Sequence, residues 1–348
     1  MSTTTREVHL AARPQGRPTP ECFAVVETEL PDPGPDEVLV RNLVMSVDPY
    51  MRPRMDDRPS YVPPYRLDAP LDGGAVGVVE DSRDPALPPG TLVAHGRGWR
   101  EHAIVGTDQL RVLPADDDLP PSYHLGLLGG PGLTAYAGLR DVARLAEGDT
   151  VYVSGGAGAV GSLVGQLARL MGAGRVVGSA GSPAKVAHMV DELGLDDGFD
   201  HHEGDLVAAL RRVAPDGVDV YFDNVGGDHL AAALEVMNHG GRIAVCGAIS
   251  TYDDRGEPCF TGDLFQVIAR RLTLRGFIST DHAALRPELE ADVREWLRTG
   301  ELVYRETVEH GLDRAAQAFL SLLSGVNVGK MVVTLADESP AAATQEST

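Results

Sequence analysis

The sequence predicts an α/β protein in which a small β-barrel domain is followed by a doubly wound parallel sheet that binds a nucleotide. Three observations lead to this fold class. Short apolar runs and prolines fill residues 1–121, apolar runs alternate with helical patterns after residue 122, and a glycine cluster joins one strand to the next helix. A chain of 348 residues is long enough for two domains that each bury a core.

The N-terminal region predicts short strands separated by turns. Apolar runs that suit strands lie at residues 22–26, 37–40, 75–79, 91–94 and 99–105. Turn sequences such as PDPGPDE and PALPPG stand between them. Residues 46–55 and 61–65 combine proline, tyrosine and methionine and suit loops over a cavity, although such loops are also common as plain connectors.

After residue 122 the pattern alternates between helix and strand. A helix entered through a Gly/Pro turn is expected over residues 127–139. Further helices are expected at 183–193, 204–213, 228–238, 262–270 and 283–298, with strands at 218–222, 242–247 and 272–278. This alternation predicts a parallel sheet with helices on both faces and ligands beyond the carboxyl ends of its strands.

These patterns divide the chain into four segments. Residues 1–121 form the barrel domain, and residues 122–310 form the nucleotide-binding domain. A helix at 312–323 and a strand at 331–335 make residues 311–336 a segment that returns to the barrel. Residues 337–348 are small and polar, and we expect them to be disordered.

The glycine cluster is the strongest functional signal. Gly156, Gly158 and Gly161 keep the G-x-G-x-x-G spacing between an apolar strand and a helix, with a second strand at the distance that a βαβ unit requires. This spacing allows a sharp turn and a close approach to a pyrophosphate at a helix N-terminus. The alternative is a glycine-rich turn in a sheet that binds nothing.

The end of the second strand of this unit favours NADPH over NADH. An NAD site has a carboxylate there for the ribose 2′-hydroxyl, whereas this chain has small residues from 179 to 182, followed by Lys185. Small polar groups and a cation suit a 2′-phosphate. Lys185 could equally be an ordinary exposed helix lysine.

Composition argues against several classes of partner. A net charge of −21 opposes binding to nucleic acid or to an anionic membrane. Three scattered cysteines indicate neither a disulfide framework nor a zinc site, and we expect no metal. No segment resembles a signal peptide or a membrane span, so we expect a cytoplasmic protein.

Seven motifs occur in a fixed order over about residues 20–335: DPYMR, PGLTAY, GAGAVGS, YFDNVGG, GRIAVCGAIS, RGF and NVGKMVV. In these the chain resembles the zinc-independent medium-chain reductases that include prostaglandin/leukotriene reductases, alkenal/one reductases and bacterial curcumin reductases. The resemblance implies a GroES-like β-barrel, a Rossmann domain, a homodimer and NADPH-dependent reduction of a carbon–carbon double bond conjugated to a ketone or aldehyde.

The resemblance also assigns site residues. It implies that the pyrophosphate lies against Gly156, Gly158, Ala159, Val160 and Gly161, and the 2′-phosphate against Ser182 and Lys185. Around the ribose and the nicotinamide it places Asn224, Cys246, Ile249 and Ser250. At the carboxamide and diphosphate ends it places Thr134, Phe277 and Asn327. It lines the substrate cleft with Tyr50, Tyr65, Trp99 and Tyr252.

Two residues depart from the family pattern. His201 stands where relatives usually have a tyrosine near the 2′-phosphate, and a protonated imidazole there would tighten NADPH binding below pH ~6.5. If His201 is instead neutral in solvent, affinity is independent of pH. Gly130 replaces a bulkier methionine beside the nicotinamide.

Tyr252 is the candidate catalytic residue, because it follows a strand end and could hydrogen-bond the substrate carbonyl or relay a proton to the α-carbon. The nicotinamide-ribose hydroxyl is a competing donor, and Tyr252 could be only a wall of the pocket.

Two other functions remain open. A quinone reductase would share the cofactor site, and a non-enzymatic NADPH-binding protein would bind the cofactor without turnover.

Overall fold

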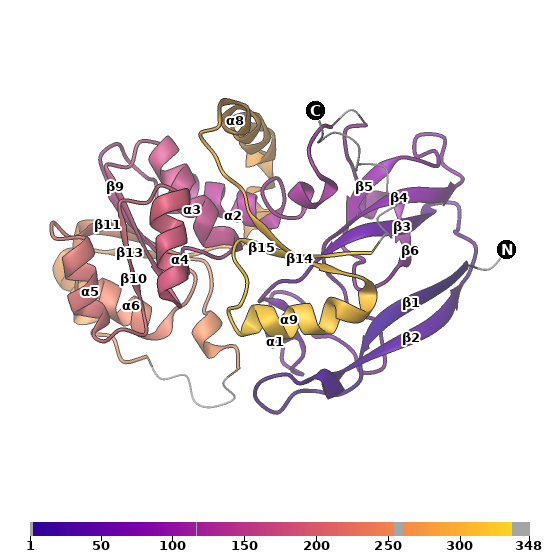
Figure 1. Cartoon of the computed structure of the whole chain (residues 1–348), viewed down its shortest axis with the longest axis horizontal. Coiled ribbons are helices and arrows are strands. Elements are labelled where there is room, and N and C mark those ends of the chain that lie inside the picture. Colours follow the sequence, from indigo (N-terminus) through magenta and orange to yellow (C-terminus); the bar gives the residue numbers. More distant parts are fainter. Residues whose placement is uncertain (1–2, 116, 254–259, 336–348) are drawn as a thin grey trace, which may run out of the picture.

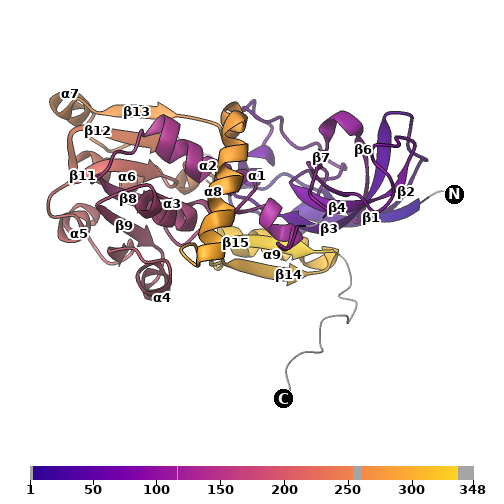
Figure 2. The ribbon, with the colours of Figure 1, turned by 90° about the horizontal axis from the view of Figure 1, so that it is seen from above.

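The computed structural model describes residues 3–115, 117–253 and 260–335, which form two lobes (Figure 1). The expected disordered tail, residues 337–348, lies outside the described residues. Helix α8 (Arg286–Thr299) runs along the junction between the lobes in both views (Figures 1 and 2). Helix α9 (Ala315–Leu323) belongs to the barrel lobe, because Phe319 packs in the core cluster of that lobe.

Within the described ranges, six strands form a parallel sheet in the order β10-β9-β8-β11-β12-β13. The strands are β8 (Thr150–Ser154), β9 (Arg175–Ala180), β10 (Asp197–Asp200), β11 (Val218–Asp223), β12 (Met237–Val245) and β13 (Thr273–Gly276). The order reverses at β8, so the sheet is doubly wound and its ligand-binding edge lies beyond β8 and β11. The predicted fold class is confirmed.

Helices cover both faces of this sheet because successive side chains of a strand point to opposite faces. Val151 and Val153 of β8 join one core cluster with α2, α3 and α8, and Tyr152 joins the other with α5 and α6. The remaining helices of this lobe are α2 (Gly130–Ala137), α3 (Ala159–Leu170), α4 (Pro183–Ala187), α5 (Leu206–Val213), α6 (Gly227–Leu234) and α7 (Phe265–Arg270).

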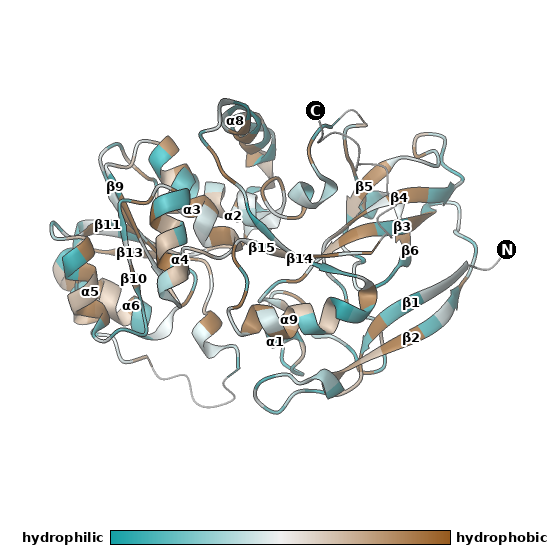
Figure 3. Ribbon diagram, in the orientation of Figure 1, coloured by the Kyte–Doolittle hydropathy of each residue, from teal (hydrophilic) through white to brown (hydrophobic). Residues whose placement is uncertain are grey.

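Three sequence predictions of elements in this chain need correction. The helix expected over 228–238 ends at Leu234, because β12 begins at Met237 and pairs with Val218. Strand β10 was missed because its four residues, DGFD, are not an apolar run. Strand β1 (Thr3–Leu10) was missed because its only apolar residues are Val8 and Leu10, which makes it largely hydrophilic (Figure 3). It pairs antiparallel with β2 (Phe23–Leu30).

The second lobe contains a sheet in the order β14-β15-β3-β4-β5-β7, with β6 paired to β3. Its strands are β3 (Glu37–Ser46), β4 (Ala75–Ser82), β5 (Leu92–His95), β6 (His102–Gly106), β7 (Arg111–Val112), β14 (Glu306–His310) and β15 (Lys330–Thr334). Strand β14 lies inside the range that we assigned to the nucleotide-binding domain, but it pairs with β15 in this sheet. The return to the barrel sheet therefore begins by residue 306.

None of the helices in the described ranges has both the length and the apolar character needed to span a bilayer.

Candidate active site

The glycine-rich turn between β8 and α3 has the close contacts that its spacing predicts. A Cβ atom on Gly161 would lie 2.2 Å from the Gly155 carbonyl oxygen, and one on Gly156 would lie 2.4 Å from the Met189 sulfur. Gly155 has a φ of +63°, in the left-handed region that favours glycine. Larger residues would therefore separate α3 from the end of β8.

The N-terminus of α3 offers hydrogen-bond donors to an anion. Its N-cap residue, Gly158, makes no side-chain bond to the first N–H groups of the helix, which belong to Ala159, Val160 and Gly161. The partial positive charge of this 12-residue helix adds to the attraction. The residues that we assigned to the pyrophosphate therefore lie together at one helix end.

A loop from the C-terminal segment lies directly on this turn. The Gly329 N–H donates to the Ala157 carbonyl oxygen at 2.9 Å, and Gly329 forms an isolated bridge with Gly158. Asn327 is 6% exposed, and its Nδ2 donates to the Gly329 carbonyl oxygen at 2.8 Å. Asn327 thus stands beside the turn, where its side chain holds its own loop.

The end of β9 carries the residues that we assigned to the 2′-phosphate. Ser182 is the N-cap of α4, and its Oγ accepts a hydrogen bond from the Lys185 N–H at 3.4 Å. The Lys185 Nζ donates to the Gly325 carbonyl oxygen at 2.6 Å, and burial lowers the pKa of this ammonium group. Lys185 is therefore tied to the C-terminal loop, unlike an ordinary exposed helix lysine.

His201 follows β10 and faces the same strand end. The main-chain N–H of His201 donates to the Ala180 carbonyl oxygen at 3.0 Å, and a Cβ on Gly181 would lie 3.2 Å from the His201 Cε1. Burial lowers the pKa of His201, and the neighbouring His202 lowers it further. Without a bound anion, the imidazole therefore gains its charge at a lower pH than the sequence analysis expected.

Asp223, which sequence reasoning missed, organises the end of β11. It is fully buried, and its Oδ1 accepts hydrogen bonds from the Tyr221 hydroxyl at 2.7 Å and from the N–H groups of Val225 and Gly226 at 3.0 and 2.7 Å. Burial raises its pKa. The main-chain oxygen of Asp223 also accepts from the Cys246 N–H at 2.9 Å. The motif YFDNVGG carried this signal, because an acidic residue there directly follows an apolar strand.

The loops after β11 and β12 are bonded to each other. The Asn224 Nδ2 donates to the Ser154 carbonyl oxygen at 2.8 Å, which ties this loop to the end of β8. The Ser250 Oγ donates to the Val225 carbonyl oxygen at 2.6 Å, and the Ile249 N–H donates to the Asn224 carbonyl oxygen at 3.5 Å. The structure therefore brings the expected ribose and nicotinamide residues to the sheet edge that holds the glycine-rich turn.

Thr134 lies in α2, and Phe277 directly follows β13. The Thr134 Oγ1 donates to the Gly130 carbonyl oxygen at 2.8 Å within α2. The Phe277 ring packs edge-on against Phe222, with ring centroids 6.1 Å apart. A Cβ on Gly130 would have no atom within 4 Å, so the absence of a larger side chain at this position leaves open space.

Tyr252 lies in the 246–252 loop, next to a thiol and to a tyrosine from the barrel lobe. Burial raises the pKa of its phenol, and the nearby Tyr61 and Cys246 raise it further. Burial also raises the pKa of the Cys246 thiol, to about 12. Tyr252 therefore stays protonated at neutral pH, which suits a hydrogen-bond donor.

The barrel-lobe residues that we assigned to the substrate cleft differ in how far they are buried. Tyr50 is half-buried at the start of α1 (Met51–Arg54), and burial raises the pKa of its phenol. Tyr65 is 4% exposed, and its hydroxyl donates to the Asp72 carbonyl oxygen at 2.6 Å. Trp99 is 1% exposed and packs between Phe23 and Phe319 in the barrel core. The prediction that Trp99 lines the cleft is wrong, because its ring fills the core.

One ion pair joins the two lobes beside Tyr252. Arg52 is fully buried, and its Nε donates to the Asp253 carboxylate at 3.2 Å. Its Nη2 donates to the Gly16 carbonyl oxygen at 2.7 Å. Sequence reasoning named the motif DPYMR without assigning its arginine a role. This guanidinium fixes the residue that follows the candidate catalytic tyrosine.

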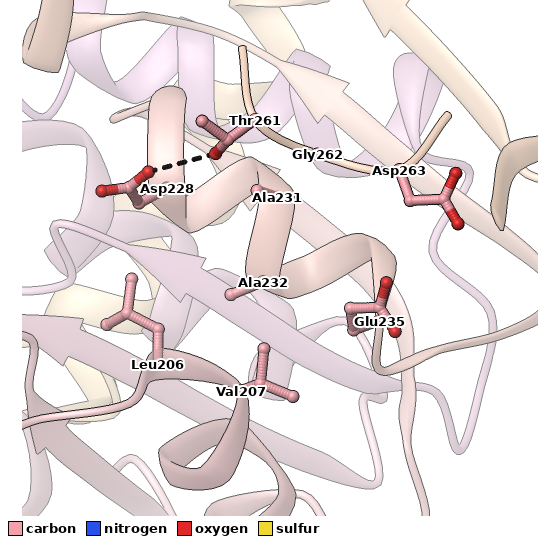
Figure 4. A pocket seen from close by; sticks show the side chains of 9 residues that line it. All are labelled: Leu206, Val207, Asp228, Ala231, Ala232, Glu235, Thr261, Gly262 and Asp263. Carbon is pink, nitrogen blue, oxygen red and sulfur yellow. Dashed lines mark hydrogen bonds between the residues drawn. The ribbon is translucent and has the colours of Figure 1, made fainter. Parts of the chain in front are cut away.

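A pocket elsewhere on the nucleotide-binding lobe has an acidic lining. A shallow pocket of about 400 Å³ lies between α5, α6 and residues 261–263 (Figure 4). Its charged lining groups are the carboxylates of Asp228, Glu235 and Asp263, which repel phosphates. This pocket therefore does not suit a dinucleotide.

Comparisons with known proteins agree with this arrangement. Residues 6–113 match the family model described as the N-terminal domain of oxidoreductase, and residues 159–297 match the one described as zinc-binding dehydrogenase. The NADPH-dependent curcumin reductase of Escherichia coli K12 is 39% identical over 94% of this chain and 96% of its own length. The NADP(+)-dependent 2-alkenal reductase of Nicotiana tabacum is 43% identical over 90% of this chain and 91% of its own.

Solved structures show the same similarity. The crystal structure of CurA from Vibrio vulnificus in complex with NADPH superposes with a TM-score of 0.91 at 39% identity, over 95% of this chain and 99% of that one. A quinone oxidoreductase of Pseudomonas syringae pv. tomato DC3000 superposes with a TM-score of 0.76 at 23% identity, over 95% and 99% of the two chains. At that identity, the second likeness shows a shared fold.

Proposed function

Because the chain belongs to the medium-chain dehydrogenase/reductase family of prostaglandin, 2-alkenal and curcumin reductases, we propose that it reduces the carbon–carbon double bond of α,β-unsaturated ketones and aldehydes, without a catalytic zinc. The chain is an NADPH-dependent oxidoreductase of this type. The observation that carries the proposal is the bonding between the strand-end loops, which sets Tyr252 and the glycine-rich turn along one sheet edge.

The residues at this edge fit the phosphorylated dinucleotide. The turn from Gly156 to Gly161 offers N–H donors for the pyrophosphate, and a Cβ at either of these two positions would collide with Met189 or with Gly155 and distort the turn. Ser182, Lys185 and His201 would hold the 2′-phosphate at the end of β9. When bound, NADPH supplies the hydride.

The chain's own contribution to the reaction is to orient the substrate and to stabilise charge on its carbonyl oxygen. Charge develops on this oxygen when the β-carbon of an enone accepts a hydride. The Tyr252 hydroxyl, whose pKa is raised by burial, would donate a hydrogen bond to this oxygen. Tyr50 would form the barrel side of the cleft, whereas Tyr65 is buried in the same core cluster as Trp99 and, with Arg54 stacked 3.9 Å over its ring, would support this loop from the core.

A panel of substrates tests the proposal. NADPH oxidation is followed by absorbance with alkenals, cyclic enones, long-chain conjugated ketones and quinones, and the products are identified by mass spectrometry. We expect saturated ketones and aldehydes from the enones and enals. Faster turnover of quinones would replace the proposal with a quinone reductase, and tight NADPH binding without turnover of any compound would replace it with a non-enzymatic binding protein.

We also propose that the protein is a homodimer that pairs through β13. This strand ends the parallel sheet, and its residues are exposed. The neighbouring α7 exposes Phe265 and Ile268 to 65% and 72%, which suits a covered apolar face. Light scattering should give twice the mass of one chain, and Ile268→Asp should halve it. A wild-type mass equal to one chain at micromolar concentration would contradict this assembly.

A further inference from the structure

Three histidines and an aspartate gather at the carboxyl ends of β9 and β10. Asp200 ends β10, and His201 and His202 follow it directly. Each of these three residues offers one ligand atom, and the three atoms lie within 4.8 Å of one another. Both imidazoles lie against the end of β9, since a Cβ on Gly181 would be 3.2 Å from the His201 Cε1 and 3.4 Å from the His202 Cε1.

The contacts of Asp200 hold this group in place. Its Oδ1 accepts the His202 main-chain N–H at 3.0 Å and lies 3.0 Å from the His202 Nδ1. A carboxylate bonded to one imidazole nitrogen leaves the other nitrogen free to bind a metal, as is common behind protein metal ligands.

A second observation independently indicates a ligand. His229 in α6 is 7% exposed, and its Nε2 is among the buried side-chain atoms of the described residues that have no hydrogen-bond partner. Its ring packs edge-on against His201, with centroids 5.0 Å apart. An unsatisfied buried imidazole is costly unless something binds it.

We propose that Asp200, His201 and His202, with His229 beside them, bind one divalent transition-metal ion of the Zn²⁺ or Co²⁺ class when the cofactor is absent. Neutral imidazoles and one carboxylate suit these ions, whereas Mg²⁺ prefers an all-oxygen shell. The His202 side chain is 67% exposed. Asp200 still anchors this residue through the His202 main-chain N–H, while the exposed ring can turn to bring its nitrogen to the separation of about 3.4 Å that two ligands of one zinc ion require.

The site shares His201 with the proposed 2′-phosphate site, but it lies away from the strand ends where the proposed reduction takes place. Strand β10 is four positions from β12 in the sheet, which is roughly 19 Å at the usual strand spacing. The sequence analysis expected no metal and gave His202 and His229 no role, because they are not spaced as metal ligands within the sequence. The third imidazole comes from a helix that follows the next strand, so only the fold brings it near.

Co²⁺ and Zn²⁺ binding to untagged, EDTA-treated protein tests the proposal. We expect one equivalent of Zn²⁺ by equilibrium dialysis, visible absorption bands on adding Co²⁺, and no displacement by millimolar Mg²⁺. His202→Ala removes an exposed side chain and should weaken Zn²⁺ binding at least tenfold, as should Asp200→Asn. His239→Ala, at an exposed histidine of β12, is the matched control and should bind as the wild type does.

Two outcomes would overturn the site. One is the absence of Co²⁺ bands and of stoichiometric Zn²⁺ in the wild-type protein. The other is Zn²⁺ binding that is unchanged by both His202→Ala and Asp200→Asn. Circular dichroism and the melting temperature identify any variant that has lost its fold, and His229→Gln, which keeps a side chain of similar reach, provides an additional measurement of the fourth ligand.

Discussion

The cofactor side and the substrate side of the proposed cleft are built in different ways. The cofactor side consists of neighbouring strand ends whose loops are held by main-chain bonds, such as those from Gly329 to Ala157 and from Cys246 to Asp223. The substrate side consists of single side chains from both lobes, joined by the Arg52–Asp253 ion pair. Substitutions on the first side should therefore act through backbone geometry, and those on the second through individual hydrogen bonds.

The largest effect is expected where the backbone itself is crowded. Gly161→Ala places a Cβ atom 2.2 Å from the Gly155 carbonyl oxygen, which cannot move without displacing α3. We expect NADPH affinity to fall about a hundredfold, because overpacking of this kind costs about 1–3 kcal/mol. Fluorescence titration with NADPH measures the effect.

The matched control is Gly96→Ala, since a Cβ on Gly96 has no atom within 4 Å and its φ is not positive. This variant should bind NADPH as the wild type does. If Gly161→Ala binds equally well, the turn does not hold the pyrophosphate.

Tyr252→Phe tests the substrate side. Removing the hydroxyl deletes one donor to the charged oxygen, so kcat should fall about tenfold to a hundredfold while the Kd for NADPH stays constant. Tyr123→Phe is the control, because its ring packs on Tyr304 in a different part of the molecule. A loss of less than tenfold in kcat would limit Tyr252 to positioning the substrate.

The same contrast explains what the sequence could and could not predict. The glycine-rich turn was predictable because its residues are consecutive and its geometry is local. Trp99 was misplaced because its burial depends on Phe23 and Phe319, which lie far away in the sequence. Arg52 was missed as an organising residue because its hydrogen-bond partners, Gly16 and Asp253, lie far away in the sequence. Strand β10 was missed because burial by neighbours, rather than its own composition, makes DGFD a strand.

Lys185→Met would show how much of the cofactor side depends on a side chain. Deleting a charged donor to the 2′-phosphate should raise the Kd for NADPH about tenfold and leave the weak binding of NADH unchanged. Arg211→Ala, at an exposed cation of α5, controls for the loss of one positive charge. Equal losses for NADPH and NADH would mean that Lys185 supports the fold of the loop through Gly325 and does not read the phosphate.

A smaller effect is expected from pH. The pKa of His201 is below its usual value in the free protein, because burial and His202 disfavour its charge, and a bound dianion would raise it. Binding then takes up a proton between these two pKa values, so NADPH affinity should increase a few-fold as pH falls from 7 to 5. The affinity for NADH should stay flat, as should that of His201→Gln for NADPH. A pH-independent Kd for NADPH in the wild type would remove His201 from the phosphate site.

The smallest effect concerns Cys246, which under the proposed function would border the bound nicotinamide and an electrophilic enone. A thiolate there would attack the substrate, but burial and Asp223 raise the pKa of this thiol to about 12. At pH 7.5 the thiolate fraction is then roughly 3 in 100,000, so alkylation by iodoacetamide should be negligible over an hour. Mass mapping after treatment checks this, with denatured protein as the control in which Cys246 reacts. Rapid modification of native Cys246 would mean that the cleft does not bury its thiol, and the argument that Tyr252 is held protonated by the same burial would fail with it.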